Sequence, residues 1–199
     1  MILRRFFVTV IAATLLVGAC GGDPPPPPPP PPGPDMDSLQ AYNDSVAAAA
    51  AEARRRAEEE AAARRAEEAR QRAIREARAT LMEMVHFAYD ESEIEPEAAQ
   101  TLRAKVAVLR ASPQVQLRIE GHADERGSTE YNLALGNRRA ESVRQFLTGF
   151  GLAENRFSIV SFGESRPMVQ ASSEEAWAQN RRAEFVITAG MNAINPPSN

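Results

Sequence analysis

Hydrophobic and polar residues follow a different spacing in each of three parts of this chain. An apolar run from Phe6 to Val17 comes first. From 39 to 83 the chain is rich in Ala, Glu and Arg and contains no Gly or Pro. This composition predicts one long helix of roughly 65 Å. From 84 to 190, alternating apolar positions and helical spacing take turns, which predicts a globular domain.

The segment at 39–83 is expected to be a single solvated helix. Acid-first pairs four residues apart, such as Glu52 and Arg56, stabilise an isolated helix. A heptad seam of apolar residues is interrupted by Glu60 and Glu67, so a strong coiled coil is not supported. Weak self-association of this helix is the alternative.

The domain at 84–190 has the predicted order β-α-β-α-β-α-β. Pro96 can open its first helix, and Ser172 with Glu175 resembles a capping box for a short helix that carries Trp177. Because helical crossovers connect parallel strands, the fold class is α+β, with a small mixed sheet and helices packed on one face. The strands are expected at 84–89, 115–122, 157–162 and 183–189.

The start of the chain has the pattern of an export signal. Arg4 and Arg5 precede an apolar run that is too short for a comfortable membrane span. Small residues then precede Cys20, the only cysteine, as in a bacterial lipobox. This predicts a signal peptide at 1–19 and a lipidated Cys20, and several acyl chains would give a stable anchor. The alternative is an ordinary signal peptide with an incidental cysteine.

Flanking segments are expected to lack a packed core. The linker at 20–38 contains nine consecutive prolines from Pro24 to Pro32. Such a run favours polyproline II and would form a semi-rigid spacer of roughly 28 Å. The polar tail at 191–199 is expected to be disordered.

Charge and residue counts exclude several function classes. The net charge is −4, and it is near −6 without the two arginines that precede Cys20, so no nucleic-acid partner is expected. A single cysteine excludes an internal disulfide, and two histidines exclude a His-rich metal site. No cofactor and no metal are therefore expected. The chain has no G-x-S-x-G elbow, and the pair Asp90 and Asp124 is weak evidence for acid–base chemistry, so we expect no enzyme.

The candidate site centres on Arg139. Asn132, Leu135, Arg139 and Val143 share one helix face, which places a guanidinium on an apolar stripe. This arginine is expected to need an anionic partner, either Asp124 in the preceding loop or a ligand carboxylate. Together, Asp124, Asn132 and Arg139 suit a zwitterion such as an amino-acid head. An internal ion pair that fixes the loop against the helix is the alternative.

Seven short motifs stand out within the globular domain. They are FAYD at 87–90, GHADERG at 121–127, EYN at 130–132, LG at 135–136, RRA at 138–140, SIVSFG at 158–163 and NRRA at 180–183. With these motifs the domain resembles the OmpA-like C-terminal domain family, and in particular its peptidoglycan-associated lipoproteins (Pal). The resemblance covers about 84–190 and leaves out the helical segment at 39–83.

This resemblance implies non-covalent binding of peptidoglycan through the diaminopimelate of its stem peptide. Carried over by motif, Asp124 would face the ligand ammonium and Arg139 its carboxylate, Asn132 would line the site, and Tyr89 and Asp90 would close it. The family also implies the TolB propeller as a partner. The sequence thus predicts an outer-membrane lipoprotein that faces the periplasm and tethers the membrane to the cell wall. A wall-remodelling enzyme and an accessory scaffold lipoprotein are the alternatives.

Overall fold

The structure is a computed structural model that describes residues 29, 33 and 35–197. The predicted signal peptide, Cys20 and most of the proline linker lie outside the described residues. The chain divides into two compact units, residues 1–53 and 54–199. Among the described residues, no helix combines the length and apolar character that crossing a membrane requires.

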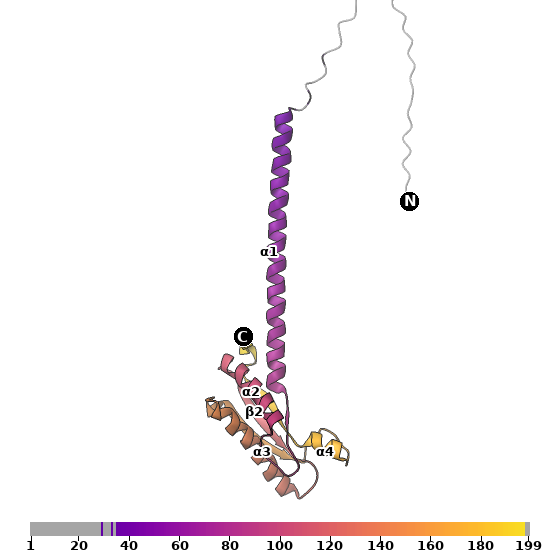
Figure 1. The fold of residues 1–199 in the computed structure, drawn as a ribbon, viewed down its shortest axis with the longest axis vertical. Coiled ribbons are helices and arrows are strands. Elements are labelled where there is room, and N and C mark those ends of the chain that lie inside the picture. The colour runs from indigo at the N-terminus through magenta and orange to yellow at the C-terminus, as the bar shows by residue number, and fades with distance from the viewer. Residues whose placement is uncertain (1–28, 30–32, 34, 198–199) are drawn as a thin grey trace, which may run out of the picture. The chain divides into compact units, whose positions relative to one another are not determined.

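The predicted long helix is confirmed as α1, Met36–Met82 (Figure 1). It begins three residues before the predicted start at Leu39, and Asp35 accepts a hydrogen bond from the backbone N–H of Leu39 at 3.1 Å. Most of its side chains are exposed, but Ala77 and Leu81 near its end are buried. The last turns of α1 therefore belong to the core of the second unit.

The predicted small mixed sheet is confirmed, with four strands in the order β1-β4-β2-β3. β2 runs parallel to β3, whereas β4 is antiparallel to both β1 and β2. The first strand is shorter than predicted, because the chain turns away from the sheet after the Phe87 N–H bonds to the Arg181 carbonyl. The strands are β1 Val85–His86, β2 Gln116–His122, β3 Phe157–Gly163 and β4 Arg182–Ala189.

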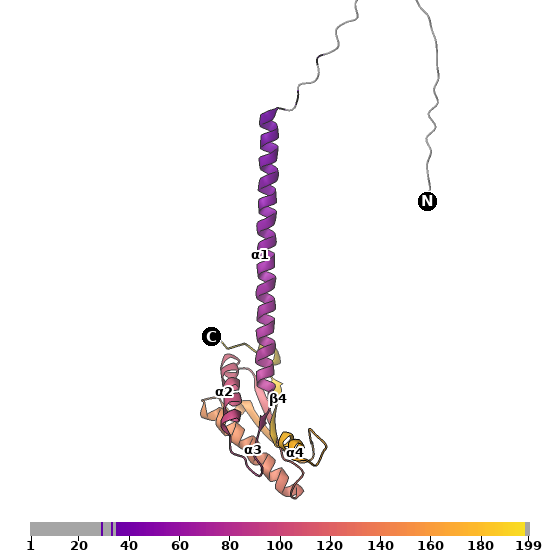
Figure 2. The ribbon, with the colours of Figure 1, turned by 45° about the vertical axis from the view of Figure 1, so that its right-hand side comes forward.

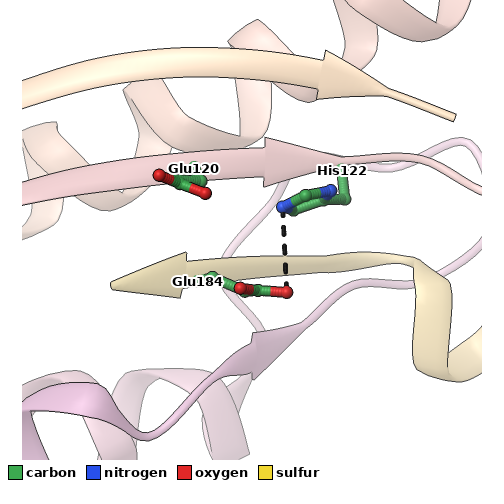
Figure 3. A group of neighbouring side chains, drawn as sticks. All are labelled: Glu120, His122 and Glu184. Carbon is green, nitrogen blue, oxygen red and sulfur yellow. Dashed lines mark ion pairs between the residues drawn. The ribbon is translucent and has the colours of Figure 1, made fainter. Parts of the chain in front are cut away.

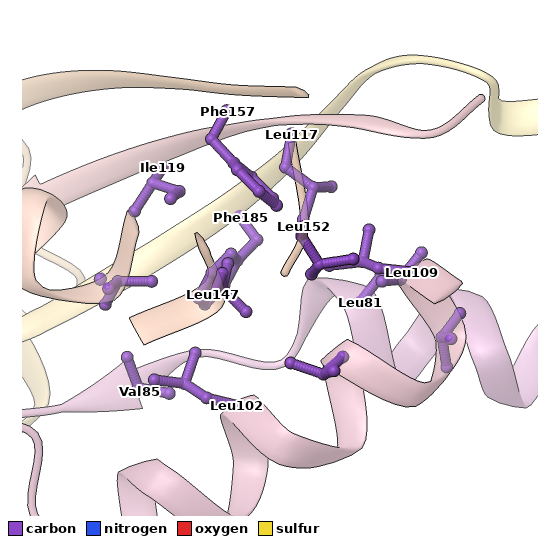
Figure 4. Close-up of a cluster of buried hydrophobic side chains, with 14 of the residues drawn as sticks. Leu81, Val85, Leu102, Leu109, Leu117, Ile119, Leu147, Leu152, Phe157 and Phe185 are labelled. Carbon is purple, nitrogen blue, oxygen red and sulfur yellow. The ribbon is translucent and has the colours of Figure 1, made fainter. Parts of the chain in front are cut away.

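One face of the sheet is covered by helices, as predicted. Alternation along the strands sends Leu117 and Ile119 of β2 and Phe185 of β4 to the same side. These side chains pack with the end of α1 and with the helices α2 and α3 (Figure 4). Figure 2 shows the ribbons of α2 and α3 beside the strands. The helices after α1 are α2 Pro96–Ala111, α3 Thr129–Gly149 and α4 Glu174–Asn180.

Two local predictions are wrong. The cap of α4 is Ser173, whose side chain accepts from the Ala176 N–H, whereas Ser172 bonds to Glu125. The disordered-tail prediction fails for residues 191–195, since Met191–Ala193 form the 3-10 helix η2 and Ile194 is buried in the core. The backbone N–H of Asn195 also donates to Ser112 Oγ at 2.8 Å.

A glycine pair sets the distance between α3 and the sheet. A Cβ on Gly121 of β2 would collide with the carbonyl of Gly136, and one on Gly136 would collide with Ser161 Oγ. The helix and strand backbones therefore touch, which only residues without a side chain allow. This close approach brings the neighbouring turns of α3, with Asn132 and Arg139, down onto the end of β2.

Gly136→Ala should destabilise the domain, because the added methyl group must push α3 away from β2 and β3. Overpacking of this kind costs about 2 kcal/mol. Urea unfolding of the full chain measures the change. Gly149→Ala in the same helix is the matched control, since nothing lies within 4 Å of its Cβ position. Equal stabilities for the two variants would contradict the close-contact interpretation.

Lys105 joins the end of α1 to the domain. It lies on α2, is fully buried, and its Nζ donates to the carbonyls of Thr80 (2.6 Å), Leu81 (3.2 Å) and Glu83 (2.5 Å). Carbonyls in the last turn of a helix have no partner within the helix and carry its negative dipole end. The ammonium group therefore caps α1 from a neighbouring helix.

Lys105→Met should lower the free energy of unfolding by about 3 kcal/mol, because it leaves these buried carbonyls without donors. Thermal and urea unfolding of the full chain measure the loss. The matched control is Arg103→Met, an exposed cation of the same helix. A stability close to that of wild type in Lys105→Met would show that the cap contributes little.

Candidate functional site

A small cavity of about 100 Å³ lies where the loops after β1 and β2 meet the start of α3. Of the predicted site residues, Tyr89, Asp90, Asp124 and Asn132 line it, and Arg139 does not. The volume suits a small charged group rather than a drug-sized ligand. The complete lining is Tyr89, Asp90, Asp124, Arg126, Gly127, Tyr131, Asn132 and Leu135.

Asp124 is a buried carboxylate held by arginines. Its Oδ1 accepts from the backbone N–H (3.0 Å) and the Nε (3.1 Å) of Arg126, and its Oδ2 accepts from Arg126 Nη2 at 2.8 Å. Arg181 Nη1 lies 3.5 Å from Oδ2. Burial raises the pKa of Asp124, but the side-chain and backbone hydrogen bonds from Arg126 outweigh burial and lower it overall. Asp124 is therefore ionised at neutral pH.

Arg139 is 0% exposed and does not line the cavity. Its Nε donates to the Glu91 carbonyl (2.8 Å), its Nη1 to that of His122 (2.7 Å) and its Nη2 to that of Ala88 (3.1 Å). The internal Asp124–Arg139 ion pair, one of the predicted alternatives, is not formed. Three backbone carbonyls take the place of Asp124 as its partners, and the other predicted partner, a ligand carboxylate, stays a prediction.

The contacts of Arg139 join the two loops that line the cavity. Ala88 and Glu91 flank the turn with Tyr89 and Asp90, and His122 ends β2 just before Asp124. Burial lowers the pKa of Arg139 to about 10, and the charge of Asp124 opposes this shift. The group is thus cationic at neutral pH. A guanidinium has five N–H donors, so two remain for a further acceptor.

The turn after β1 holds Asp90 in an unusual conformation. Its φ of 58° lies in the left-handed region, and among the described residues no other non-glycine residue has a positive φ. Its carboxylate accepts a hydrogen bond from the Tyr131 hydroxyl. Asn132 is buried, and its amide donates to Glu164. Strained backbone held by several contacts is typical of binding sites.

Arg126 is the site residue that the sequence did not reveal. Its guanidinium stacks between the rings of Tyr89, 4.0 Å away, and Trp177, 4.1 Å away, while it pairs with Asp124. Arg126 follows Asp124 by two residues in the GHADERG motif, and that proximity was the available signal. No signal in the sequence indicated that Arg126 would stack on Trp177, because only the fold brings these two residues together.

The sheet order, the helices on one face and the charged cavity at the end of β2 define a small ligand-binding α+β domain. The model of the OmpA family matches residues 86–181. The crystal structure of the peptidoglycan-associated lipoprotein from Burkholderia pseudomallei matches with a TM-score of 0.52 and 38% identity, over 53% of this chain and 89% of that one. The chain belongs to the OmpA family.

Curated relatives carry the name peptidoglycan-associated lipoprotein. That of Brucella melitensis is 46% identical over 103 residues, which is 52% of this chain and 61% of the relative. That of Pseudomonas aeruginosa is 43% identical over 100 residues, 50% of this chain and 59% of the relative. The chain thus spans less than two thirds of their length. The C-terminal domain of Helicobacter pylori MotB shares the fold, with a TM-score of 0.51 and 19% identity over 56% of this chain and 88% of that one.

Arg139→Lys should destabilise the domain although it keeps the charge. A lysine has its three donors on one nitrogen and cannot reach carbonyls on two separate loops, so unfolding should become easier by about 2 kcal/mol. Urea unfolding of the full chain provides the measurement. The matched control is Arg138→Lys, the exposed neighbour on the same helix. Similar losses in both variants would argue against Arg139 as the joint between the loops.

Proposed function

We propose that the domain binds peptidoglycan non-covalently through the diaminopimelate of the stem peptide. One observation carries the proposal: a buried, ionised Asp124 borders a small cavity, and the buried, cationic Arg139 binds the backbone of both loops that line it. The free end of diaminopimelate is an amino-acid head, with an ammonium beside a carboxylate. An anion and a cation held at fixed positions complement such a zwitterion.

Asp124 is the partner proposed for the ligand ammonium. All its described hydrogen bonds come from Arg126 and Arg181. A ligand ammonium would therefore replace the side chain of Arg126, which is 28% exposed. The displaced guanidinium can keep its stacking partners, since the Tyr89 and Trp177 rings do not depend on the ion pair. Binding then exchanges one cation on Asp124 for another and leaves no buried charge unpaired.

Arg139 is the partner proposed for the ligand carboxylate. Two of its N–H groups are left for a ligand, and its hydrogen bonds to Ala88 and Glu91 hold the turn that contains Tyr89 and Asp90. A small movement of this turn would expose these N–H groups to a carboxylate in the cavity. Asp90, in its left-handed conformation, is the residue of the turn that is under strain.

For the whole chain we propose an outer-membrane lipoprotein that tethers the membrane to the cell wall. The relatives named peptidoglycan-associated lipoprotein support this role for the shared domain. The proposal includes three further features of the whole chain. They are a lipid anchor on Cys20, a location on the periplasmic side of the outer membrane, and TolB as a partner. The proposed role of the domain is binding rather than catalysis, and the name peptidoglycan-associated lipoprotein of its relatives supports this role.

Asp124→Asn should weaken binding to diaminopimelate-containing sacculi by at least about tenfold, because it removes the charge that pairs with the ammonium. Co-sedimentation of the purified full chain with sacculi measures this, and free diaminopimelate should compete. Glu130→Gln, an exposed carboxylate in the first turn of α3, is the matched control and should sediment like wild type.

Two further measurements test the proposed ligand and the alternative of a wall-remodelling enzyme. Sacculi with lysine in place of diaminopimelate lack the second carboxylate, so they should bind more weakly than the diaminopimelate type. Release of soluble fragments from the sacculi would favour a wall-remodelling enzyme. If folded Asp124→Asn sediments as well as wild type, the assignment of this site is wrong.

A further inference from the structure

The face of the sheet opposite the core carries a second cluster of ligand-type side chains. Glu120 and His122 project from β2, and Glu184 projects from the adjacent strand β4 (Figure 3). Glu120 and Glu184 are direct partners in the antiparallel register. Side chains two residues apart on one strand, and opposite each other on two strands, share a face. The cluster is therefore built on rigid sheet positions rather than on loops.

Within the described part of the chain, neither ring nitrogen of His122 forms a hydrogen bond. Its side chain is buried, with the whole residue 1% exposed, and neither Nδ1 nor Nε2 has a hydrogen-bond partner among the described residues. A buried polar group without a partner is costly, and native structures rarely keep one without a reason. Phe162 stacks against the ring, with 5.5 Å between the centroids, and fixes its orientation. Nε2 points towards Glu184, 3.9 Å from its Oε1 (Figure 3).

The three side chains lie close enough to share one ion. One ligand atom from each of Glu120, His122 and Glu184 can be chosen so that all lie within 4.8 Å of one another. Zinc binds nitrogen and oxygen ligands at about 2.0–2.2 Å, so its ligands stand somewhat more than 3 Å apart. A small rotation of the glutamate side chains closes that difference. An imidazole with carboxylates suits borderline divalent ions.

We propose that Glu120, His122 and Glu184 bind one divalent transition-metal ion of the Zn²⁺ class, with water completing its coordination. The scarcity of histidines excludes only a His-rich site, and this ligand set needs a single imidazole. The proposal does not rest on peptidoglycan binding, because the cluster lies on β2 and β4, neither of which contributes a residue to the lining of the cavity.

Two arginines set the strength of this site. Arg118 Nη2 lies 2.6 Å from Glu120 Oε1, and Arg182 Nη2 lies 2.5 Å from Glu184 Oε1. Each arginine approaches Oε1 of its carboxylate, and the Glu184 Oε1 is also the atom that lies 3.9 Å from His122 Nε2. The guanidinium groups also compete with a metal for the negative charge. Arg118 is the more accessible competitor, because its side chain is 42% exposed and that of Arg182 is 4% exposed.

Zinc titration of the chelator-treated full chain tests the site. We expect saturable binding of one Zn²⁺ per chain by isothermal titration calorimetry and a higher melting temperature with zinc. Glu184→Gln and His122→Asn should weaken binding by at least about tenfold, since each removes a ligand. His86→Gln, which removes the other histidine, should bind like wild type and is the matched control.

Arg118→Ala provides a test that does not depend on altering a buried ligand. Removing this competing cation should tighten zinc binding several-fold, whereas a purely structural ion pair predicts no change or a loss. Circular dichroism confirms that each variant is folded. The proposal is overturned if wild type shows no saturable zinc binding. It is also overturned if folded Glu184→Gln or His122→Asn binds zinc as tightly as wild type.

Discussion

The candidate site depends on the hydrogen bonds that one buried guanidinium donates to three carbonyls. Arg139 holds the turn after β1 and the end of β2 together, and the walls of the cavity are the residues next to those carbonyls. A buried cation without partners would be too costly to keep. Here the carbonyl dipoles offset that cost, and because they are fixed in direction, they also fix the loops. The same interaction stabilises the fold and shapes the cavity.

This chemistry recurs at other junctions of the domain. Lys105 caps α1 through three carbonyls, and Arg156 donates to the carbonyls at the connection between α2 and β2. Each cation comes from a different element than the carbonyls it binds. Segment ends leave carbonyls unpaired, and a long cationic side chain can reach several of them at once. Hydrogen bonds from cationic side chains to backbone carbonyls thus hold the connections between elements in place, as apolar packing holds the core.

The regular elements can be predicted from sequence, but the contacts at the site cannot. Helices and strands leave a periodic pattern, so α1, α2, α3 and β2 were expected close to where they lie. Every residue has a carbonyl, so nothing in the sequence marks Ala88, Glu91 and His122 as the partners of Arg139. The nearest acid, Asp124, was the natural guess, but Arg126 occupies it. The position of Ile194 in the core likewise depends on the completed sheet.

The end of β2 contributes to both proposed sites because its side chains alternate. Gly121 faces α3 and lets the helix touch the strand, so Arg139 reaches the His122 carbonyl. The His122 side chain projects to the other face, towards Glu184. Asp124 follows two residues later and borders the cavity. One residue therefore contributes its carbonyl to the proposed peptidoglycan site and its imidazole to the proposed metal site. An ion that drew His122 towards β4 would also act on the carbonyl that Arg139 holds, so occupancy of the metal site should bear on the shape of the cavity.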